Sequence, residues 1–291
     1  MKKHLNILNT VAEYQEYSAS TAYSKPNVTY VRENKVLYYD YGDNKPQADM
    51  SNYKGEFQEK SVGGDYWGKS AITKINYIKS GITSLDSAFE NYASLVTVPD
   101  IPNSVTHMFK TFAGCSSLLT APEIPSVVTN IQYAFANCSS LLTAPVIPSS
   151  VTDLQSTFYG CSSLVNAPDI PSGVTNMYST FYNCTSLVNA PDIPSGVTNM
   201  PYTFFSCSSL VNAPEIPNSV TRMPNTFMDC KSLKEVTLLS TTPPTYVQAL
   251  VGCQSLESIY VPDESVDTYK TATGWSEFAD KFKPLSSKPS E

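Results

Sequence analysis

A period of 23 residues constrains this chain more than any other feature of its sequence. Seven phenylalanines follow one another at this spacing without an insertion, and Leu250 continues the series. They are Phe89, Phe112, Phe135, Phe158, Phe181, Phe204 and Phe227. All seven cysteines keep the same spacing, from Cys115 to Cys253, and a leucine follows each of them three residues later. A fixed period of this length is the signature of a repeat architecture.

Each repeat reads as one coil of a solenoid. Isoleucine followed by proline and valine followed by threonine complete the unit, as at Ile124-Pro125 and Val128-Thr129. One coil cannot bury these apolar side chains alone, but stacking at the ~4.8 Å spacing of paired strands turns each equivalent position, or slot, into a buried column. We expect two extended pieces per coil, Ser-Leu-Val-Asn-Ala and Val-Thr-Asn-Met, an Ile-Pro-Ser-Gly corner between them, and a short helical turn at Phe-Tyr-Gly-Cys. The prediction is a mainly β fold of 23-residue coils with short helical turns.

The N-terminal part of the chain does not follow the period. Residues 1–65 are free of cysteine and rich in Tyr, Lys and Glu, so they are read as a small α+β module that docks the protein elsewhere. A helix is expected at residues 10–18. Two strands joined by a turn are expected at 27–31 and 36–41, because β-branched and aromatic residues dominate there.

Both ends of the repeat array carry caps in this interpretation, since end coils would otherwise expose apolar faces. The solenoid is assigned to residues 66–257. Its first recognisable repeat is incomplete, because the segment that begins at Ile82 matches only the second half of a coil. Residues 258–291 are read as a C-terminal helical cap and tail. That helix is expected to break near Gly274, before the apolar Trp275.

Three motifs together carry a family resemblance. They are Phe-x-x-Cys-x-Ser-Leu followed by Ile-Pro-x-x-Val-Thr, then Ile259-Tyr260-Val261-Pro262, then Trp275-Ser276-Glu277-Phe278-Ala279-Asp280. Over about residues 80–285 the chain resembles the BspA-type leucine-rich repeats of gut and oral bacteria. It departs from them by placing Ala-Pro where those repeats usually carry a second aliphatic residue. The resemblance implies a leucine-rich-repeat solenoid and a surface protein that binds host proteins or other cells.

Composition and charge exclude several partners. The formal net charge is -7, and no cluster of Lys and Arg exists that could coat nucleic acid or an anionic membrane. No stretch approaches the ~18 apolar residues of a membrane span. Met1-Lys2-Lys3 is followed by a segment that polar residues interrupt, so no export signal is predicted. We therefore expect neither nucleic acid nor membrane as a partner.

The cysteine column admits two readings. Neighbouring coils would bring the Cα atoms within ~5 Å, which a disulfide tolerates. Inward-pointing thiols in a packed column also behave as small apolar side chains, and we favour buried free thiols. Because the period places the sulfurs in a line and not in a tetrahedral cluster, no metal site is predicted.

A second column carries carboxylates directly before the Ile-Pro motif. Its members are Asp100, Glu123, Asp169, Asp192 and Glu215, with Val146 in the remaining slot. Like charges at ~5 Å need screening by solvent or by a cation. Solvated surface acids are favoured over a bound calcium ion, and no cofactor is predicted.

The residue inventory gives catalysis little support. The two histidines, His4 and His107, lie in unrelated regions, and no nucleophile elbow, phosphate loop or zinc-binding histidine pair is present. The chain is therefore not predicted to be an enzyme.

Aromatic residues in variable slots are the candidate binding residues. They are Tyr133, Tyr159, Tyr178, Tyr182, Tyr202 and Phe205. Such side chains could stack on sugars or anchor a protein partner. An equally weighted alternative is that they pack on neighbouring coils.

These features predict a non-enzymatic structural and binding protein. The first hypothesis is a bacteriophage virion appendage, a head or tail fibre or decoration, motivated by the missing export signal. In it, residues 1–65 bind other virion proteins and the solenoid attaches to a host surface protein or glycan. The alternative is a bacterial cell-surface adhesin, which the resemblance implies, and a third reading is a cytoplasmic scaffold. A homo-oligomer stays open, since no coiled-coil heptad specifies one.

Overall fold

The computed structural model describes residues 81–289, residues 73–75 and 78, and the backbone of three N-terminal strands. Those strands are β1 (Leu5–Leu8), β2 (Asn27–Val31) and β3 (Val36–Asp40), in the order β1-β2-β3. Strand β2 is parallel to β1 and antiparallel to β3. The two strands expected from the sequence are therefore β2 and β3, whereas β1 was not expected. The helix predicted at residues 10–18 lies outside the described residues.

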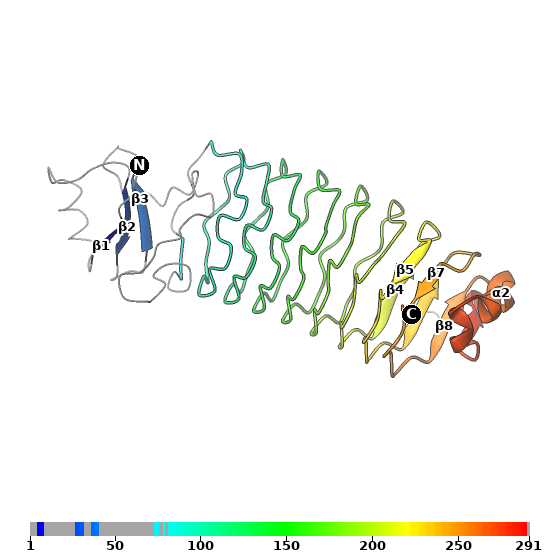
Figure 1. The fold of residues 1–291 in the computed structure, drawn as a ribbon. Helices are drawn as coiled ribbons and strands as arrows, with labels where there is room; N and C mark the ends of the chain where they lie inside the picture. Colours follow the sequence, from blue (N-terminus) through cyan, green and yellow to red (C-terminus); the bar gives the residue numbers. More distant parts are fainter. Residues whose placement is uncertain are drawn as a thin grey trace.

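Residues 81–261 wind into coils that stack along one axis (Figure 1). Parallel β-bridges join residues that are 23 positions apart, for example Thr120 to Thr143 and Ser84 to His107. Backbone hydrogen bonds also cross from coil to coil, as where the Phe158 amide donates to the Thr180 carbonyl at 3.0 Å. Each coil therefore satisfies polar groups of its neighbours.

Proline limits the bridges that follow the buried leucine of each coil. Most coils carry a proline such as Pro168 beside the bridge, and proline has no N–H to donate to a ladder. Where Thr237 takes that slot, a continuous strand forms, β6 (Glu235–Leu238). Its neighbour β4 (Asn212–Ile216) still contains Pro214, and the register of this pair shifts between Asn212 and Glu215.

Two small parallel sheets lie at the C-terminal end of the array. The first has the order β4-β6-β8-β9, with β8 at Ser258–Val261 and β9 at Phe282–Pro284. The second pairs β5 (Arg222–Pro224) with β7 (Thr245–Val247). The first sheet thus continues beyond residue 257, where the sequence interpretation ended the solenoid.

The predicted short helical turn at Phe-Tyr-Gly-Cys is wrong. Consecutive turns occupy this part of the coil, which we call the turn edge and define by residues 154–161 and their equivalents. Ser156 (φ 52°) and Gly160 (φ 70°) both have left-handed backbone there. Because a right-handed helix cannot contain such residues, the segment cannot be helical.

The left-handed conformation recurs at two slots of every coil. The first slot holds Ser87, Lys110, Tyr133, Ser156, Ser179, Tyr202, Asn225 and Gln248. The second holds Asn91, Gly114, Asn137, Gly160, Asn183, Ser206, Asp229 and Gly252. Within the described residues, helices occur only after residue 262.

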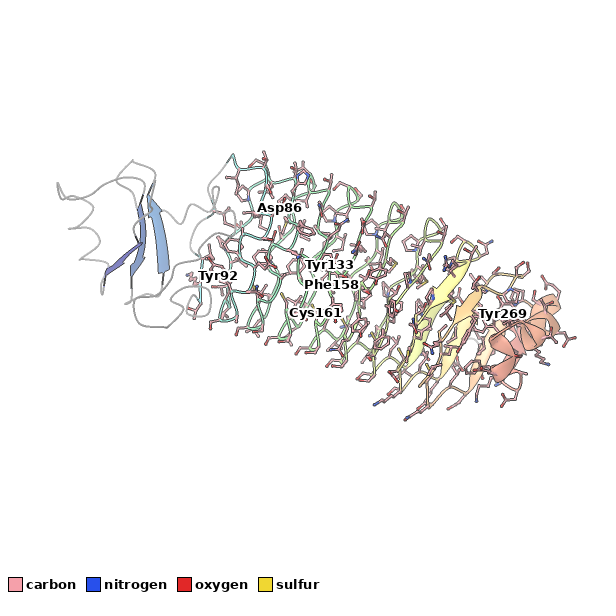
Figure 2. All side chains as sticks on the ribbon, viewed as in Figure 1. Asp86, Tyr92, Tyr133, Phe158, Cys161 and Tyr269 are labelled. Carbon is pink, nitrogen blue, oxygen red and sulfur yellow. The ribbon has the colours of Figure 1, made fainter. Side chains whose placement is uncertain are left out.

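A ladder of phenylalanine rings runs through the core. Successive rings from Phe89 to Phe227 stack with centroids 5.3–5.8 Å apart, and each ring is fully buried. The cysteine column lies beside them, as Figure 2 shows for Phe158 and Cys161. The thiol of Cys161 donates to the Phe135 carbonyl of the previous coil at 3.1 Å, and the other cysteines repeat this bond. Apolar stacking and a hydrogen bond thus act at the same place in each coil.

The coil register extends to the N-terminal side of Ile82 and there stays within residues 66–257, the range that the sequence interpretation gave to the solenoid. Lys74 forms a parallel bridge with Thr97, one period later. Ile75 and Ile78 are buried and occupy the slots of Val98 and Ile101. The coil register therefore starts before the first repeat that is recognisable in the sequence.

Short helices cover the C-terminal end. They are η1 (Asp263–Ser265), α2 (Val266–Thr271), η2 (Trp275–Phe278) and η3 (Leu285–Ser287). The Tyr269 hydroxyl donates to the Ser240 carbonyl at 2.8 Å, and the Trp275 ring N–H donates to the Pro244 carbonyl at 2.7 Å. Gly274, with φ 79°, separates α2 from η2, at the position where the sequence predicted a break.

The phenylalanine ladder yields a stability prediction. Replacing Phe158 with alanine leaves a cavity between two stacked rings, so the free energy of unfolding should fall by about 3–5 kcal/mol. Chemical denaturation followed by circular dichroism measures it. The exposed Thr152→Ala variant is the control and should stay within about 0.5 kcal/mol of the parent. A loss below about 1 kcal/mol in Phe158→Ala would contradict the ladder.

Two glycines provide a matched pair for the left-handed slots. Gly160 has φ 70°, and an added Cβ would collide with Asn137 Oδ1 of the previous coil. Gly173 has no left-handed backbone, and its nearest contact would be the Ser149 carbonyl at 3.9 Å. Gly160→Ala should therefore destabilise the fold by more than about 1 kcal/mol, whereas Gly173→Ala should be neutral or stabilise it by up to about 1 kcal/mol. Thermal denaturation of both variants tests this, and equal effects would refute it.

Candidate functional site

The turn edge places three aromatic side chains in an outward column. Each of these residues directly follows a core phenylalanine, and its side chain lies outside the buried ladder. They are Tyr159, Tyr182 and Phe205. The rings of Tyr159 and Tyr182 stack with centroids 4.6 Å apart and planes at 10°. Those of Tyr182 and Phe205 stack at 4.5 Å and 3°. The three rings thus form a second, outer ladder over three coils.

Two further tyrosines adjoin this column. Tyr202 lies 6.1 Å from Phe205 and 6.4 Å from Tyr182 between ring centroids. Tyr178 meets Tyr202 edge to face at 6.0 Å. We call Tyr159, Tyr178, Tyr182, Tyr202 and Phe205 the aromatic patch. Tyr178 is 40% exposed, and the other four are half-buried.

Tyr133, the sixth predicted residue, belongs to a different cluster. Its ring meets Phe109 edge to face at 5.9 Å, and Lys110 Nζ lies 5.6 Å from its centroid. The Gln155 amide donates to its hydroxyl at 2.8 Å. Phe109 and Lys110 were missed as candidates, although Phe109 shares its slot with Tyr178 and Lys110 shares its slot with Tyr133.

The ring contacts agree with the reading that these aromatics pack on neighbouring coils, and their role in binding stays a prediction. The rings do pack on neighbouring coils, yet they keep part of their surface exposed. Burial raises the pKa of the Tyr182 hydroxyl, and the nearby Tyr159, Tyr202 and Asp229 raise it further. A tyrosine hydroxyl is protonated at neutral pH, so that of Tyr182 can donate a hydrogen bond.

The cysteine column is a structural feature and not a reactive site. None of the seven cysteines forms a disulfide, six are buried, and Cys253 is half-buried. Burial raises the pKa of the thiols from Cys138 to Cys230 well above its ordinary value, and neighbouring cysteines raise it further. For Cys253, burial raises the pKa to about 12. A protonated, buried thiol is a poor nucleophile.

Other candidate sites are weaker. Within residues 73–75, 78 and 81–289, no group of three or more His, Cys, Asp or Glu residues is arranged to hold a metal ion. The acidic column is exposed, and Glu215 pairs with Lys288 at 3.2 Å. His107 contacts the Thr106 hydroxyl at 2.8 Å, whereas His4 lies outside the described residues.

No helix in the described part of the chain has the length and apolar character needed to cross a membrane.

Stacked parallel coils with an inward leucine column define a leucine-rich-repeat protein. The chain belongs to the BspA type leucine-rich repeat family, whose sequence profile matches residues 60–165 and 155–273. The resemblance stated from the sequence motifs is thereby confirmed.

Several solved structures are similar to the chain. A leucine-rich repeat protein from Bacteroides ovatus is 24% identical, with a TM-score of 0.44 over 67% of this chain and 59% of that protein. The T. pallidum leucine-rich repeat protein is 25% identical, with a TM-score of 0.45 over 69% of this chain and 82% of the other. A leucine-rich cell surface protein from Faecalibacterium prausnitzii is 21% identical, with a TM-score of 0.29 over 74% and 76% of the two chains.

No curated protein matches the sequence. The chain spans only 59% of the length of the Bacteroides ovatus protein.

The raised thiol pKa values predict how stability depends on pH. Thiols of the unfolded chain lose their protons near pH 8.5, while those of the folded column stay protonated. Below that pH, the free energy of unfolding therefore does not change with pH through these thiols. Above it, the free energy of unfolding falls by about 1.4 kcal/mol per pH unit for each thiol that ionises only in the unfolded chain. Denaturation at pH 7.5 and pH 9.5 measures the loss. A Cys161→Ala variant should lose less between these two pH values than the parent, and an equal loss would contradict this cause.

Proposed function

We propose that this protein is a non-enzymatic binding protein of the adhesin type, whose solenoid holds a macromolecular partner on the aromatic patch. The observation that carries this proposal is the gathering of Tyr159, Tyr182 and Phe205, with Tyr178 and Tyr202, on one surface. Tyrosine is enriched among the residues that dominate binding energy at protein interfaces.

The fold does not require aromatics in the outer column. The equivalent slot holds Ala113 and Ala136 in the two preceding coils and Met228 and Val251 in the two following ones. Since alanine meets the structural demands of this slot, three consecutive aromatic rings there need another reason. Binding supplies that reason.

The ring geometry favours a protein partner over a glycan. A sugar stacks on the open face of an aromatic ring. Both faces of Tyr182 are covered, by Tyr159 at 4.6 Å and by Phe205 at 4.5 Å. The column therefore offers ring edges and hydroxyl groups, which suit a mixed apolar and polar protein surface. Of the sequence alternatives, we propose the surface protein and not the glycan.

Location at a bacterial cell surface fits this role best. Leucine-rich proteins of this type include bacterial cell-surface proteins. In this arrangement, residues 1–65 dock the protein, residues 66–257 present the binding surface, and residues 258–291 close the array. We also propose that the protein can form a homo-oligomer.

The role as a phage virion appendage, with residues 1–65 bound to other virion proteins, stays a prediction. Mass spectrometry of purified phage particles and of isolated cell envelopes from the source organism separates the two locations. Recovery in particles alone would overturn the cell-surface proposal.

Alanine substitution tests the aromatic patch. A triple variant, Tyr159→Ala, Tyr182→Ala and Phe205→Ala, should fold, because alanine occupies this slot in other coils. The probes are immobilised mucin, a panel of purified extracellular-matrix proteins and a printed glycan array. We expect the parent to bind at least one protein probe and the triple variant to bind it at least about a hundredfold more weakly, since each anchor residue contributes more than about 1 kcal/mol.

Val251→Ala is the matched control, because it changes the same slot outside the patch and should leave binding unchanged. Undiminished binding by the triple variant, or binding to glycans alone, would overturn the proposal.

A further inference from the structure

A different part of each coil carries exposed aliphatic side chains. We call the segment from the buried leucine to the Ile-Pro corner, residues 118–124 and their equivalents, the leucine wall. The slot after the buried leucine forms an apolar stripe along it, made of Val96, Leu119, Leu142, Val165, Val188 and Val211. The four central members are 40–52% exposed, although they are large and apolar.

A stripe of carboxylates runs parallel to the apolar stripe on the same wall. Asp100, Glu123, Asp169, Asp192 and Glu215 each lie four residues after an apolar member, and all five are exposed. Val146, which is 86% exposed, fills the remaining slot. Four residues of extended chain place the two stripes about 13 Å apart. Parallel bridges between the stripes, such as Thr143 to Asn166, keep the wall regular.

The fold does not account for the apolar stripe. On the wall, Leu118 and Ile124 are buried and Ala121 is partly buried. The side chains of the apolar stripe therefore point away from the core. In the last two coils the same slot holds Lys234 and Glu257. Since a charge is accepted there, the six consecutive aliphatics are not a requirement of coil packing.

The charge of the solenoid is concentrated in the coils that carry this wall. Residues 81–230 contain nine Asp or Glu but only two Lys or Arg, Lys110 and Arg222, so they account for the whole formal net charge of -7. Neither basic residue lies on the leucine wall. Within the described residues, only Glu215 among the stripe carboxylates forms a salt bridge, to Lys288 at 3.2 Å. The other four are available to a cationic partner.

We infer that the leucine wall is a second binding surface, which takes a cationic amphipathic helix lying along the stacking axis. Six coils at a spacing of ~4.8 Å give an apolar stripe about 24 Å long. An α-helix covers that length with about 16 residues and is about 10 Å wide. Its apolar face would lie on the stripe, and its Lys or Arg side chains would reach the carboxylates beside it.

Charge complementarity selects this occupant over two others. A second copy of the chain would bring its own carboxylates against these, and like charges repel. An anionic membrane surface would be repelled for the same reason. A cationic helix satisfies both stripes at once.

A designed peptide pair tests this surface on the 291-residue chain. The first peptide has 16 residues of Leu and Lys in an amphipathic helical pattern, and the second has Glu in place of each Lys. Fluorescence anisotropy measures the binding of each labelled peptide. We expect the Lys peptide to bind one-to-one, with affinity that falls as salt is added, and the Glu peptide to bind at least tenfold more weakly.

Two double variants locate the contact. Leu142→Ser with Val165→Ser should weaken binding of the Lys peptide by about tenfold or more. Asp169→Asn with Asp192→Asn should weaken it severalfold and reduce its salt dependence. The triple variant of the aromatic patch is the control and should bind the peptide like the parent, so this test does not depend on the proposed adhesin function.

Three results would overturn the inference: equal binding of both peptides, no binding of either, or loss of binding only in the aromatic-patch variant. Light scattering measures whether a second copy of the chain occupies the wall instead. A dimer of the parent that the Leu142→Ser and Val165→Ser variant lacks would assign the wall to a second copy instead. Circular dichroism of each variant excludes misfolding as the cause of a loss.

Discussion

The structure depends on contact between residues one period apart in successive coils. The phenylalanine rings stack at 5.3–5.8 Å, and beside them each cysteine thiol donates to a carbonyl of the previous coil. Buried threonines repeat this pattern, as where Thr157 donates to the Ile131 carbonyl at 3.2 Å. No coil is complete alone, because its apolar side chains and polar groups find their partners in the coils on either side. Stability in such an array is a sum of neighbour-to-neighbour terms.

That dependence makes the two ends of the array special. An end coil would present unpaired strand edges and an open apolar column. On the C-terminal side, Tyr269 and Trp275 cover the last coils, and both donate hydrogen bonds to coil carbonyls. The edge strand β9 has only three residues and ends with Pro284, which cannot donate to a further strand. The cap therefore closes the array against further pairing.

Because inward slots carry the fold, outward slots are free to vary. The outer column of the turn edge accepts alanine, tyrosine, phenylalanine, methionine and valine, and the stripe slot of the leucine wall accepts aliphatic and charged residues. Stacking converts such local choices into extended surfaces, since equivalent residues of adjacent coils become neighbours. A run of aromatics becomes a patch, and a run of carboxylates becomes a stripe. Recognition can thus be built without altering the core.

The sequence by itself determined the period, the inward columns, the family and the strands now seen as β2 and β3, because each follows from residue type and spacing. It also located the break at Gly274. Only the tertiary structure showed that the turn edge is a run of turns with left-handed backbone at two positions of each coil. Glycine at Gly160 favours this backbone by itself, whereas Ser156 is held in it by a hydrogen bond from its amide to the Tyr178 carbonyl of the next coil. The tertiary structure likewise joined Tyr178 and Tyr202 to the column of Tyr159 and set Tyr133 apart with Phe109. Spacing reveals which residues share a slot, but ring directions depend on what each side chain meets in the coils beside it.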